Sequence, residues 1–249
     1  MNIDLPILFF DSGLGGLTTL LIAQKVLPNE NYIYVADFLN SPFGNKTKKD
    51  IKNLVTKNIK FYIKKYNPKC IVLACNTATA VCIKSLRSEV EIPIIGTEPA
   101  IKEALRLNSR KTLILCTQAT KRYSQLLKSF SDNLAFFCPR KLAELIDQNF
   151  LYNMQKIKAY LNKSLKKFAH KFDACVLGCT HYSLVKTEIE NILGFMVVDG
   201  NFGVAKQVEK VIKEKNKIGK TLLISTDLNR QNLLYKSYKK LKGEKLCAE

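Results

Sequence analysis

Two cysteines stand in matching positions about one hundred residues apart in the chain. Each follows an apolar run and precedes a polar residue: Ile71–Ala74 leads to Cys75, and Ala174–Gly178 leads to Cys179. Each run predicts a buried strand whose thiol emerges at the carboxyl end of the strand, just before a helix. In open α/β sheets, ligands bind at this edge. Two thiols that face one crevice would form the pair of acid/base groups that is needed to move a proton from one face of a carbon to the other.

Other roles for these cysteines are less well supported by the spacing. A free cysteine often packs as a small hydrophobe, but equivalent placement of two of them at strand ends favours chemistry. The spacings Cys70-x4-Cys75 and Cys175-x3-Cys179 contain no Cys-x2-Cys pair, which disfavours a zinc or redox site. A Cys–His hydrolase is disfavoured too, because His181, two residues after its cysteine, would rarely turn back onto it.

A glycine-rich turn, Asp11-Ser12-Gly13-Leu14-Gly15-Gly16, follows the first predicted strand. A turn of this kind that opens a helix offers free N–H groups to an anion. Dinucleotide binding is an alternative, with Asp37 at the end of the second strand near a ribose. The pattern departs from that fingerprint at Thr18, where the third glycine belongs, and the chain has no Walker A motif.

Strands and helices alternate along the whole chain, which predicts βαβ units and parallel sheets. The predicted strands are Pro6–Phe10, Tyr32–Ala36, Cys70–Cys75, Ile92–Gly96, Thr112–Cys116, Leu134–Cys138, Ala174–Gly178, Phe195–Val198 and Thr221–Ser225. Among the predicted helices are a long one over Lys48–Tyr66, a continuous one over Ala119–Phe130 and one over Val204–Lys215.

We therefore expect an α/β protein of two similar lobes, each a mainly parallel sheet flanked by helices. The similarity of the two cysteine motifs suggests two similar lobes, with residues 1–97 plus 200–249 in lobe one and residues 98–199 in lobe two. The cysteines would then face a crevice between the lobes.

The formal net charge of +19 raises the question of an acidic partner. Nucleic acid or an acidic membrane surface is one interpretation, and lysine-rich solvated helix faces are the other. Lysine dominates the positive charge, whereas readout of bases and phosphates prefers arginine. The chain carries no zinc finger, RNP motif or basic tail, so we expect no specific nucleic acid partner.

The composition is that of an ordinary globular protein, with 47% hydrophobic and 24% charged residues. The first residues lead directly into a strand without a basic signal region, and no apolar run approaches the roughly 18 residues of a membrane span. Several cysteines lie in strand-like apolar runs, which is typical of a reducing compartment. The sequence thus predicts a cytoplasmic protein with no membrane partner.

Five motifs, taken together and in order, resemble those of the glutamate racemases in the cofactor-independent aspartate/glutamate racemase superfamily. They are Asp11-Ser12-Gly13-x-Gly15-Gly16, Pro42-Phe43-Gly44, Ala74-Cys75-Asn76-Thr77-Ala78, Glu98-Pro99 and Leu177-Gly178-Cys179-Thr180-His181-Tyr182. The resemblance implies two lobes related by a pseudo-two-fold axis, with the active site between them. It also implies interconversion of L- and D-glutamate to supply peptidoglycan synthesis, with neither pyridoxal phosphate nor a metal.

The resemblance also implies roles for particular residues. Cys75 and Cys179 would be the two acid/base residues, with Asp11 assisting Cys75 and His181 assisting Cys179. The residues expected to contact the substrate are Asp11, Ser12, Phe43, Gly44, Asn76, Thr77, Thr180 and His181. A homodimer is a further expectation.

The chain departs from the family pattern at a few positions. Phe43 replaces the usual tyrosine and lacks its hydroxyl, which matters little if the contact is made by backbone N–H. Asp147 is the best match to the usual assisting glutamate and is one methylene shorter. Glu98 is a second candidate for a supporting role.

Two alternatives to glutamate racemisation stay open from the sequence. One is a racemase for aspartate or another amino acid on the same scaffold. The other is a basic nucleotide- or polyanion-binding protein without racemase activity.

Overall fold

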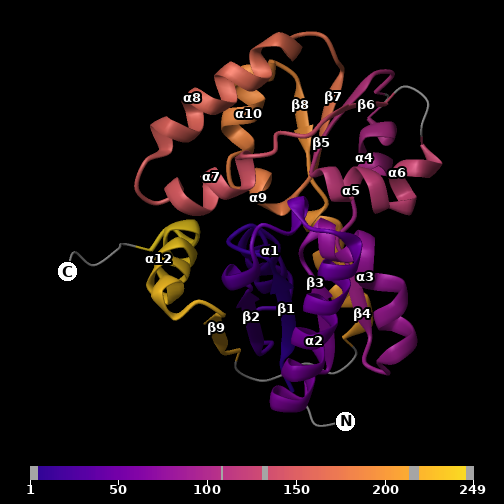
Figure 1. Ribbon diagram of the computed structural model, residues 1–249, viewed down its shortest axis with the longest axis vertical. Coiled ribbons are helices and arrows are strands. Elements are labelled where there is room, and N and C mark those ends of the chain that lie inside the picture. The colour runs from indigo at the N-terminus through magenta and orange to yellow at the C-terminus, as the bar shows by residue number, and fades with distance from the viewer. Residues whose placement is uncertain (1–4, 108, 131–133, 213–218, 245–249) are drawn as a thin grey trace.

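The computed structural model describes residues 5–107, 109–130, 134–212 and 219–244, which form two lobes stacked one above the other (Figure 1). Each lobe contains one parallel sheet flanked by helices. The α/β architecture predicted from the sequence is confirmed.

Lobe one is built on a five-stranded sheet in the order β4-β3-β1-β2-β9. The strands are β1 (Ile7–Asp11), β2 (Tyr32–Ala36), β3 (Cys70–Leu73), β4 (Ile94–Gly96) and β9 (Thr221–Ser225). All four of its neighbouring pairs are parallel. The central strand β1 is apolar up to its last residue, Asp11, as is typical of a strand with helices on both faces.

Two helical layers cover the sheet of lobe one. The helices of this lobe are α1 (Leu17–Val26), α2 (Lys48–Tyr66), α3 (Asn76–Glu89), α11 (Asn201–Val211) and α12 (Gln231–Lys242). Ile7 and Phe9 of β1 pack in the core that includes α1, α11 and α12. Leu8 and Phe10 point to the opposite face and pack in the core formed with α2 and α3. The alternation along one strand therefore assigns each helix layer to its face.

Lobe two is built on a four-stranded parallel sheet in the order β6-β5-β7-β8. Its strands are β5 (Thr112–Cys116), β6 (Leu134–Phe137), β7 (Ala174–Gly178) and β8 (Met196–Val198). Its helices are α4 (Ile101–Arg106), α5 (Gln118–Tyr123), α6 (Gln125–Ser129), α7 (Leu142–Asn149), α8 (Met154–Leu165), α9 (Thr180–Ser183) and α10 (Lys186–Leu193). Short 3-10 turns complete the fold: η1 (Phe38–Asn40), η2 (Phe43–Asn45), η3 (Lys166–Phe168) and η4 (Leu228–Arg230).

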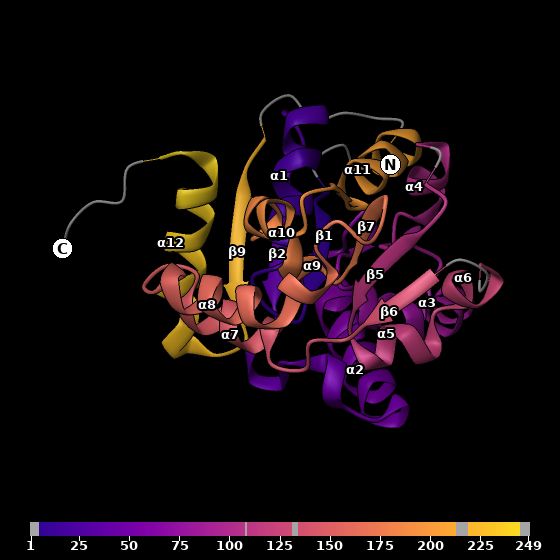
Figure 2. The same cartoon turned by 90° about the horizontal axis from the view of Figure 1, so that it is seen from above.

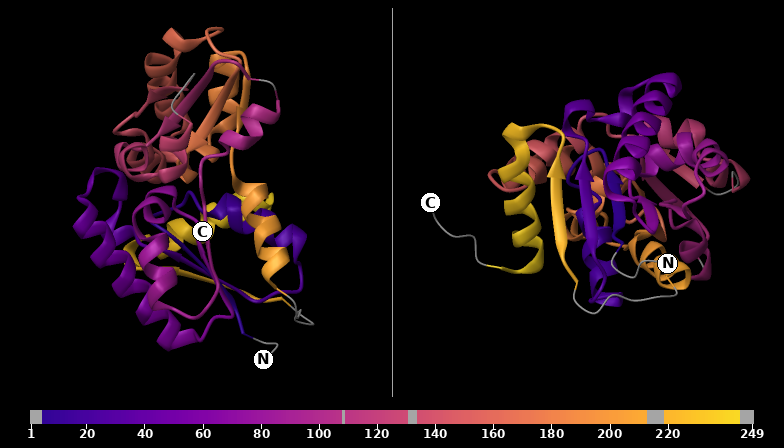
Figure 3. Two further views of the ribbon diagram at one scale, coloured as in Figure 1. Left: turned by 90° about the vertical axis from the view of Figure 1, so that its right-hand side faces the viewer. Right: turned by 90° about the horizontal axis from the view of Figure 1, so that it is seen from below.

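The chain passes between the lobes twice, once after β4 and once after β8. The two crossings touch: a Cβ added at Gly200 would lie 2.7 Å from the carbonyl oxygen of Glu98. The left view of Figure 3 shows the two chain segments that join the lobes. The assignment of the strands to two sheets fits a division near residues 97 and 200, whose exact bounds stay a prediction.

The last helix, α12, lies at the edge of lobe one beside β9 and reaches the bottom of lobe two near α7 and α8 (Figures 1 and 2). Lys240 of α12 donates to the carbonyl oxygen of Phe150 at 2.9 Å. The C-terminal helix is therefore a contact between the lobes as well as a cover for the first sheet.

Of the three predicted helices named above, two differ from those observed. The helix expected over Ala119–Phe130 is two helices, because Ser124 ends α5 and caps α6 by accepting the Leu127 N–H at 3.2 Å. The helix expected over Val204–Lys215 begins earlier, at Asn201, and ends at Val211. The last residues of that prediction lie outside the described part of the chain.

Candidate active site

A cavity lies between the two lobes, and its wall is formed mainly by residues that follow the carboxyl ends of strands. It measures about 20 Å³, which is room for about one water molecule. Lobe one contributes Ser12, Pro42, Phe43, Gly44, Asn45, Cys75, Asn76 and Thr77. Lobe two contributes Thr117, Gln118, Cys138, Pro139, Arg140, Ala143, Cys179, His181 and Tyr182. The two cysteines of the sequence motifs thus line one cavity from opposite lobes.

Cys75 lies between β3 and α3, where it is the N-cap residue of the helix. Its thiol is buried, and its sulfur is 3.8 Å from the hydroxyl oxygen of Ser12. Burial raises the pKa of the Cys75 thiol well above its ordinary value, and the negative charge of Asp11 raises the pKa further. The N–H of Ala78 and the Ser12 hydroxyl act in the opposite direction. Cys75 therefore rests as a thiol, a proton donor, with groups beside it that stabilise the thiolate.

Cys179 takes the equivalent place in lobe two. It lies between β7 and α9 and is the N-cap residue of that short helix. Its sulfur is 4.0 Å from Nδ1 of His181 and is buried. A thiol beside an imidazole can exchange a proton with it.

Asp11 ends β1 and is fully buried. One of its carboxyl oxygens accepts the N–H of Gly13 at 2.9 Å, and the other accepts the hydroxyl of Thr180 from lobe two at 3.0 Å. Burial raises the pKa of the Asp11 carboxyl, against the lowering effect of His181 and of these two hydrogen bonds. Asp11 therefore joins the two lobes and places a titratable carboxyl near Cys75.

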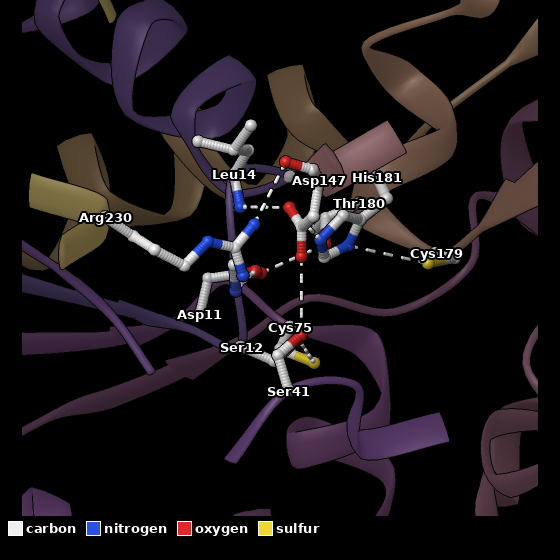
Figure 4. Close-up of polar contacts among 12 residues, drawn as sticks. Asp11, Ser12, Leu14, Ser41, Cys75, Asp147, Cys179, Thr180, His181 and Arg230 are labelled. Atoms are coloured by element: carbon white, nitrogen blue, oxygen red, sulfur yellow. Dashed lines mark hydrogen bonds and ion pairs between the residues drawn. The ribbon is translucent and has the colours of Figure 1, made fainter. Parts of the chain in front are cut away.

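Asp147 of α7 contacts residues of both lobes (Figure 4). Its Oδ1 accepts hydrogen bonds from the N–H of Leu14 and from Nε2 of His181, both at 3.0 Å. Its Oδ2 accepts the hydroxyl of Ser41 at 3.3 Å. With Nε2–H donated to Asp147, Nδ1 of His181 faces the sulfur of Cys179. The three side chains form a chain of proton-exchanging groups from carboxylate to thiol.

The Asp147 carboxylate governs the charge of His181. Burial alone would lower the pKa of His181, but the charge of Asp147 and the hydrogen bond to it raise the pKa well above 6.5, with Cys179 adding to the effect. His181 is therefore held in its protonated form and can stabilise a thiolate at Cys179.

The N-terminal ends of α3 and α5 meet at the wall of the cavity. The Thr77 hydroxyl is 2.8 Å from that of Thr117 and 3.1 Å from that of Thr120. Asn76 is held by donating from Nδ2 to the carbonyl of Thr97 at 3.2 Å. Helix N-termini and hydroxyl groups of this kind bind carboxylates.

The glycine-rich turn makes close contact with lobe two rather than enclosing an anion. A Cβ added at Gly13 would collide with the Asp147 carboxylate and lie 2.7 Å from Nε2 of His181. A Cβ added at Gly15 would lie 2.6 Å from the Thr180 hydroxyl. The absence of side chains at these positions lets the lobes approach closely.

Two residues considered in the sequence lie elsewhere. Glu98 is exposed and lines two surface depressions, and it is not among the residues that line the cavity between the lobes. Asp37 is buried and accepts hydrogen bonds from Asn40, Asn58 and Thr226, so its carboxylate serves the fold and is not available to a ribose.

The structure adds residues that sequence reasoning missed. Thr117 and Cys138 each follow a strand directly, so the rule that located the catalytic cysteine candidates could have found them. Tyr182 ends the motif that contains Cys179 and His181, so its place near the cavity could have been predicted as well. Ser41 and Arg230 carry no comparable signal, because their places depend on how the lobes pack together. Among the described residues, no group of three or more His, Cys, Asp or Glu side chains is placed to hold a metal ion. Within the same residues, no helix is both long and apolar enough to cross a membrane.

Comparison with known proteins yields consistent matches. Residues 30–208 match the family described as Asp/Glu/Hydantoin racemase. The chain is 38% identical to a glutamate racemase of Clostridium novyi, over 96% of this chain and 97% of that one. It is 38% identical to glutamate racemase 2 of Bacillus subtilis, over 85% of this chain and 83% of that one.

Solved structures are similar over nearly the full length. A glutamate racemase of Escherichia coli, in complex with L-glutamate and the activator UDP-MurNAc-ala, matches with a TM-score of 0.81 and 26% identity, over 94% of this chain and 95% of that one. A glutamate racemase isoform of Bacillus anthracis matches with a TM-score of 0.85 over 100% of this chain and 98% of that one. At 22% identity, the second likeness shows the fold alone.

Proposed function

The chain belongs to the Asp/Glu/hydantoin racemase family, and we propose that it interconverts L-glutamate and D-glutamate by proton transfer between two cysteines. The D-glutamate formed would supply peptidoglycan synthesis. The relatives at 38% identity are glutamate racemases, and the Escherichia coli structure holds L-glutamate.

The observation that carries the proposal is the pair of thiols on opposite lobes. Cys75 and Cys179 are both N-cap residues of helices that follow a strand, and both line one cavity. An α-carbon bound between them would have one thiol on each face. Inversion then requires no rotation of the intermediate, because one thiol acts as base while the other acts as acid.

The proton inventory of the reaction is simple. From D-glutamate, the Cys75 thiolate takes the α-proton and becomes a thiol, and the Cys179 thiol gives its proton to the opposite face and becomes a thiolate. From L-glutamate the roles reverse. The raised pKa of Cys75 makes its resting thiol ready to act as the acid in the L-to-D direction. The protonated His181 stabilises the thiolate of Cys179 that must act first in that direction.

Charge develops on the substrate as the α-proton leaves, and fixed donors must stabilise it. The N-terminus of α3, which begins at Asn76 and Thr77, lies on the cavity wall. Arg140 adds a positive charge at the same wall. The residues proposed to contact glutamate are Asp11, Ser12, Phe43, Gly44, Asn76, Thr77, Thr180 and His181.

Two supporting roles belong to the proposal. Asp147 takes the part of the family's assisting glutamate, because its carboxylate hydrogen-bonds His181 at 3.0 Å. Phe43 is buried with its ring 6.4 Å from that of Phe10, so the missing hydroxyl leaves an apolar wall. Any substrate contact of this turn would then be made by its backbone.

The test is α-deuterium uptake measured by proton NMR in D₂O with each pure enantiomer. Cys75→Ser should lose racemisation in both directions yet retain exchange from L-glutamate, because the surviving thiol reaches only that hydrogen. Cys179→Ser should retain exchange only from D-glutamate. Full racemase activity in both variants would refute the two-thiol mechanism, and equal exchange of both enantiomers by one variant would indicate a single base.

The same assay separates the alternatives. Comparable kcat/KM for glutamate and aspartate would favour a broader racemase, whereas we expect discrimination because a shorter acid leaves buried donors unpaired, at about 1–3 kcal/mol each. No racemisation combined with nucleotide or DNA binding at physiological salt would favour the polyanion-binding alternative. Independence from pyridoxal phosphate and metal, a homodimer and a cytoplasmic location stay predictions.

A further inference from the structure

Arg230 is a residue of lobe one that contacts the main chain of Asp147 in lobe two. It lies at the end of η4 and is the N-cap residue of α12. Its Nη2 donates to the carbonyl oxygen of Asp147 at 3.0 Å (Figure 4). Its guanidinium carbon lies 4.0 Å from the centroid of the Phe38 ring. The contact with the face of the Phe38 ring restrains the guanidinium and so helps to direct its N–H groups.

The carbonyl that Arg230 binds lies in the last turn of α7. The last four carbonyl groups of an α-helix have no partner within the helix and carry the negative end of its dipole. A cation from another element satisfies such a group and fixes the helix end. Because Asp147 also carries the carboxylate that holds His181, fixing its main chain fixes the point from which that side chain extends, and its rotamer then sets the position of the carboxylate.

Lobe one therefore holds Asp147 from two sides. The Leu14 N–H and the Ser41 hydroxyl hold the carboxylate, and Arg230 holds the backbone. The His181 contact is the only one of these hydrogen bonds that comes from lobe two. The position of the carboxylate relative to His181 thus depends on contacts made across the cleft.

Lys240 provides a natural comparison on the same helix. Its Nζ donates to the carbonyl of Phe150 at 2.9 Å and lies 4.7 Å from the centroid of that ring. Phe150 is the C-cap residue of α7, so Lys240 also binds the end of this helix. Unlike Arg230, it does not contact the residue that bears the catalytic-site carboxylate.

We propose that Arg230 is a positioning residue of the active site. It holds the Asp147 carboxylate at hydrogen-bond distance from His181 and so couples the C-terminal helix to proton transfer at Cys179. The expected effect on proton transfer rests on the proposed function. The expected effect on the position of Asp147 does not.

The groups that face His181 define what its titration reports. They are Asp147 from α7, Cys179 at the end of β7 and Asp11 at the end of β1. Arg230 is not among them, since it binds the carbonyl of Asp147 and not the imidazole. Loss of a nearby positive charge acting directly on the imidazole would raise the pKa of His181. A fall in that pKa on substitution of Arg230 would therefore be transmitted through Asp147.

The chain contains two histidines, so NMR of histidine-labelled protein follows each imidazole separately. We expect the titration midpoint of His181 to move to lower pH in Arg230→Gln, because a displaced carboxylate holds the imidazolium less strongly. Arg230→Lys should give an intermediate shift, because it keeps one donor but not the planar fork. The exposed His170 is the internal reference, and His181→Asn assigns the signals.

Lys240→Gln is the matched control, since it removes one positive charge from the same helix and frees the same helix end. It should leave the His181 titration unchanged. An unchanged His181 signal in Arg230→Gln, or an equal shift in Lys240→Gln, would overturn the inference. If Arg230→Gln fails to fold, Arg230→Lys takes its place in the comparison. The inference then requires a shift of the His181 midpoint to lower pH in Arg230→Lys that Lys240→Gln does not show.

Steady-state kinetics test the effect of Arg230 on catalysis. We expect kcat for L-glutamate to fall about tenfold in Arg230→Gln with little change in KM, a size typical of substitutions that act through an intervening group. A rise in KM alone would contradict positioning of the proton-transfer groups. If the unmodified protein racemises no glutamate but the His181 shift is still seen, the proposed function fails while the positioning role stands.

Discussion

The buried His181–Asp147 pair links the chemistry of the site to the stability of the fold. The pKa of His181 lies near 6.5 when unperturbed and well above that value in the folded protein. Because the folded state binds this proton more tightly, the stabilisation is fully present below about pH 6.5 and is lost as the pH rises through the folded pKa. The pKa of the buried Asp11 carboxyl is also raised, so its contribution to the free energy of unfolding likewise falls with rising pH, starting above about pH 3.8.

We predict that the free energy of unfolding falls as the pH is raised from about 6.5 to about 8.5, and that the slope is smaller in His181→Asn. The measurement is urea unfolding at a series of pH values. His170→Asn is the control, since His170 is exposed and its φ of 54° is one that asparagine adopts readily. An equal slope in His181→Asn and the unmodified protein would contradict the prediction.

Gly13 shows how a single missing side chain permits the site to form. A Cβ there would collide with the Asp147 carboxylate and approach Nε2 of His181. We predict that Gly13→Ala lowers kcat by about a hundredfold, because small displacements of positioned groups have effects of that size. Steady-state kinetics measure it. Gly203→Ala in α11 is the control, since its Cβ would meet no atom within 4 Å, and it should keep full activity with unchanged or raised stability.

The cysteines and the residues beside them could be located from sequence, because the carboxyl end of a buried parallel strand is recognisable from its apolar run. The pairing of Asp147 with His181 could not, since the two residues are 34 positions apart and meet only after α7 packs on α9. Arg230 gives no sequence signal at all. Its role depends on a helix of one lobe reaching the other.

At the scale of elements, local signals predicted some boundaries well and missed others. The helix over Lys48–Tyr66 was predicted with its observed bounds, and Thr47 caps it by accepting the Asp50 N–H at 3.2 Å. The break at Ser124 was missed because both sides of it have helical composition. A serine that accepts the N–H three residues later is the signal that could have marked it.

The turn η2 and the helix α5 meet across the cleft at a glycine. A Cβ added at Gly44 would lie 2.8 Å from both Cβ and Cγ2 of Thr117. We predict that Gly44→Ala raises KM for glutamate about tenfold, because the lobes would have to stand farther apart when closed. The measurement is steady-state kinetics beside thermal unfolding. The unfolding temperature should hardly change, since neither lobe's core is altered, and an unchanged KM would show that this contact does not limit closure.

At the scale of the whole molecule, the observed cavity is too small for the proposed substrate. It holds about 20 Å³, whereas glutamate is far larger than the single water molecule that fits there. Contacts across the cleft, such as Thr180 with Asp11 and Leu14 with Asp147, hold this closed arrangement. The lobes must therefore separate for substrate to enter, and the paired crossings near Glu98 and Gly200 are where the chain joins them.

We predict that glutamate slows amide hydrogen exchange selectively at the cleft. If binding and closure are coupled, exchange in segments 12–17, 41–45 and 142–149 should slow by up to about a hundredfold at a glutamate concentration one hundred times Kd. The central strands β1, β3 and β7 should change little, because their amides already exchange only through larger openings of the fold. Sodium chloride at matched ionic strength is the control, since a chain with a net charge of +19 responds to salt alone. Uniform slowing over both lobes would indicate general stabilisation, and no slowing at the cleft would mean that the lobes do not close on the substrate.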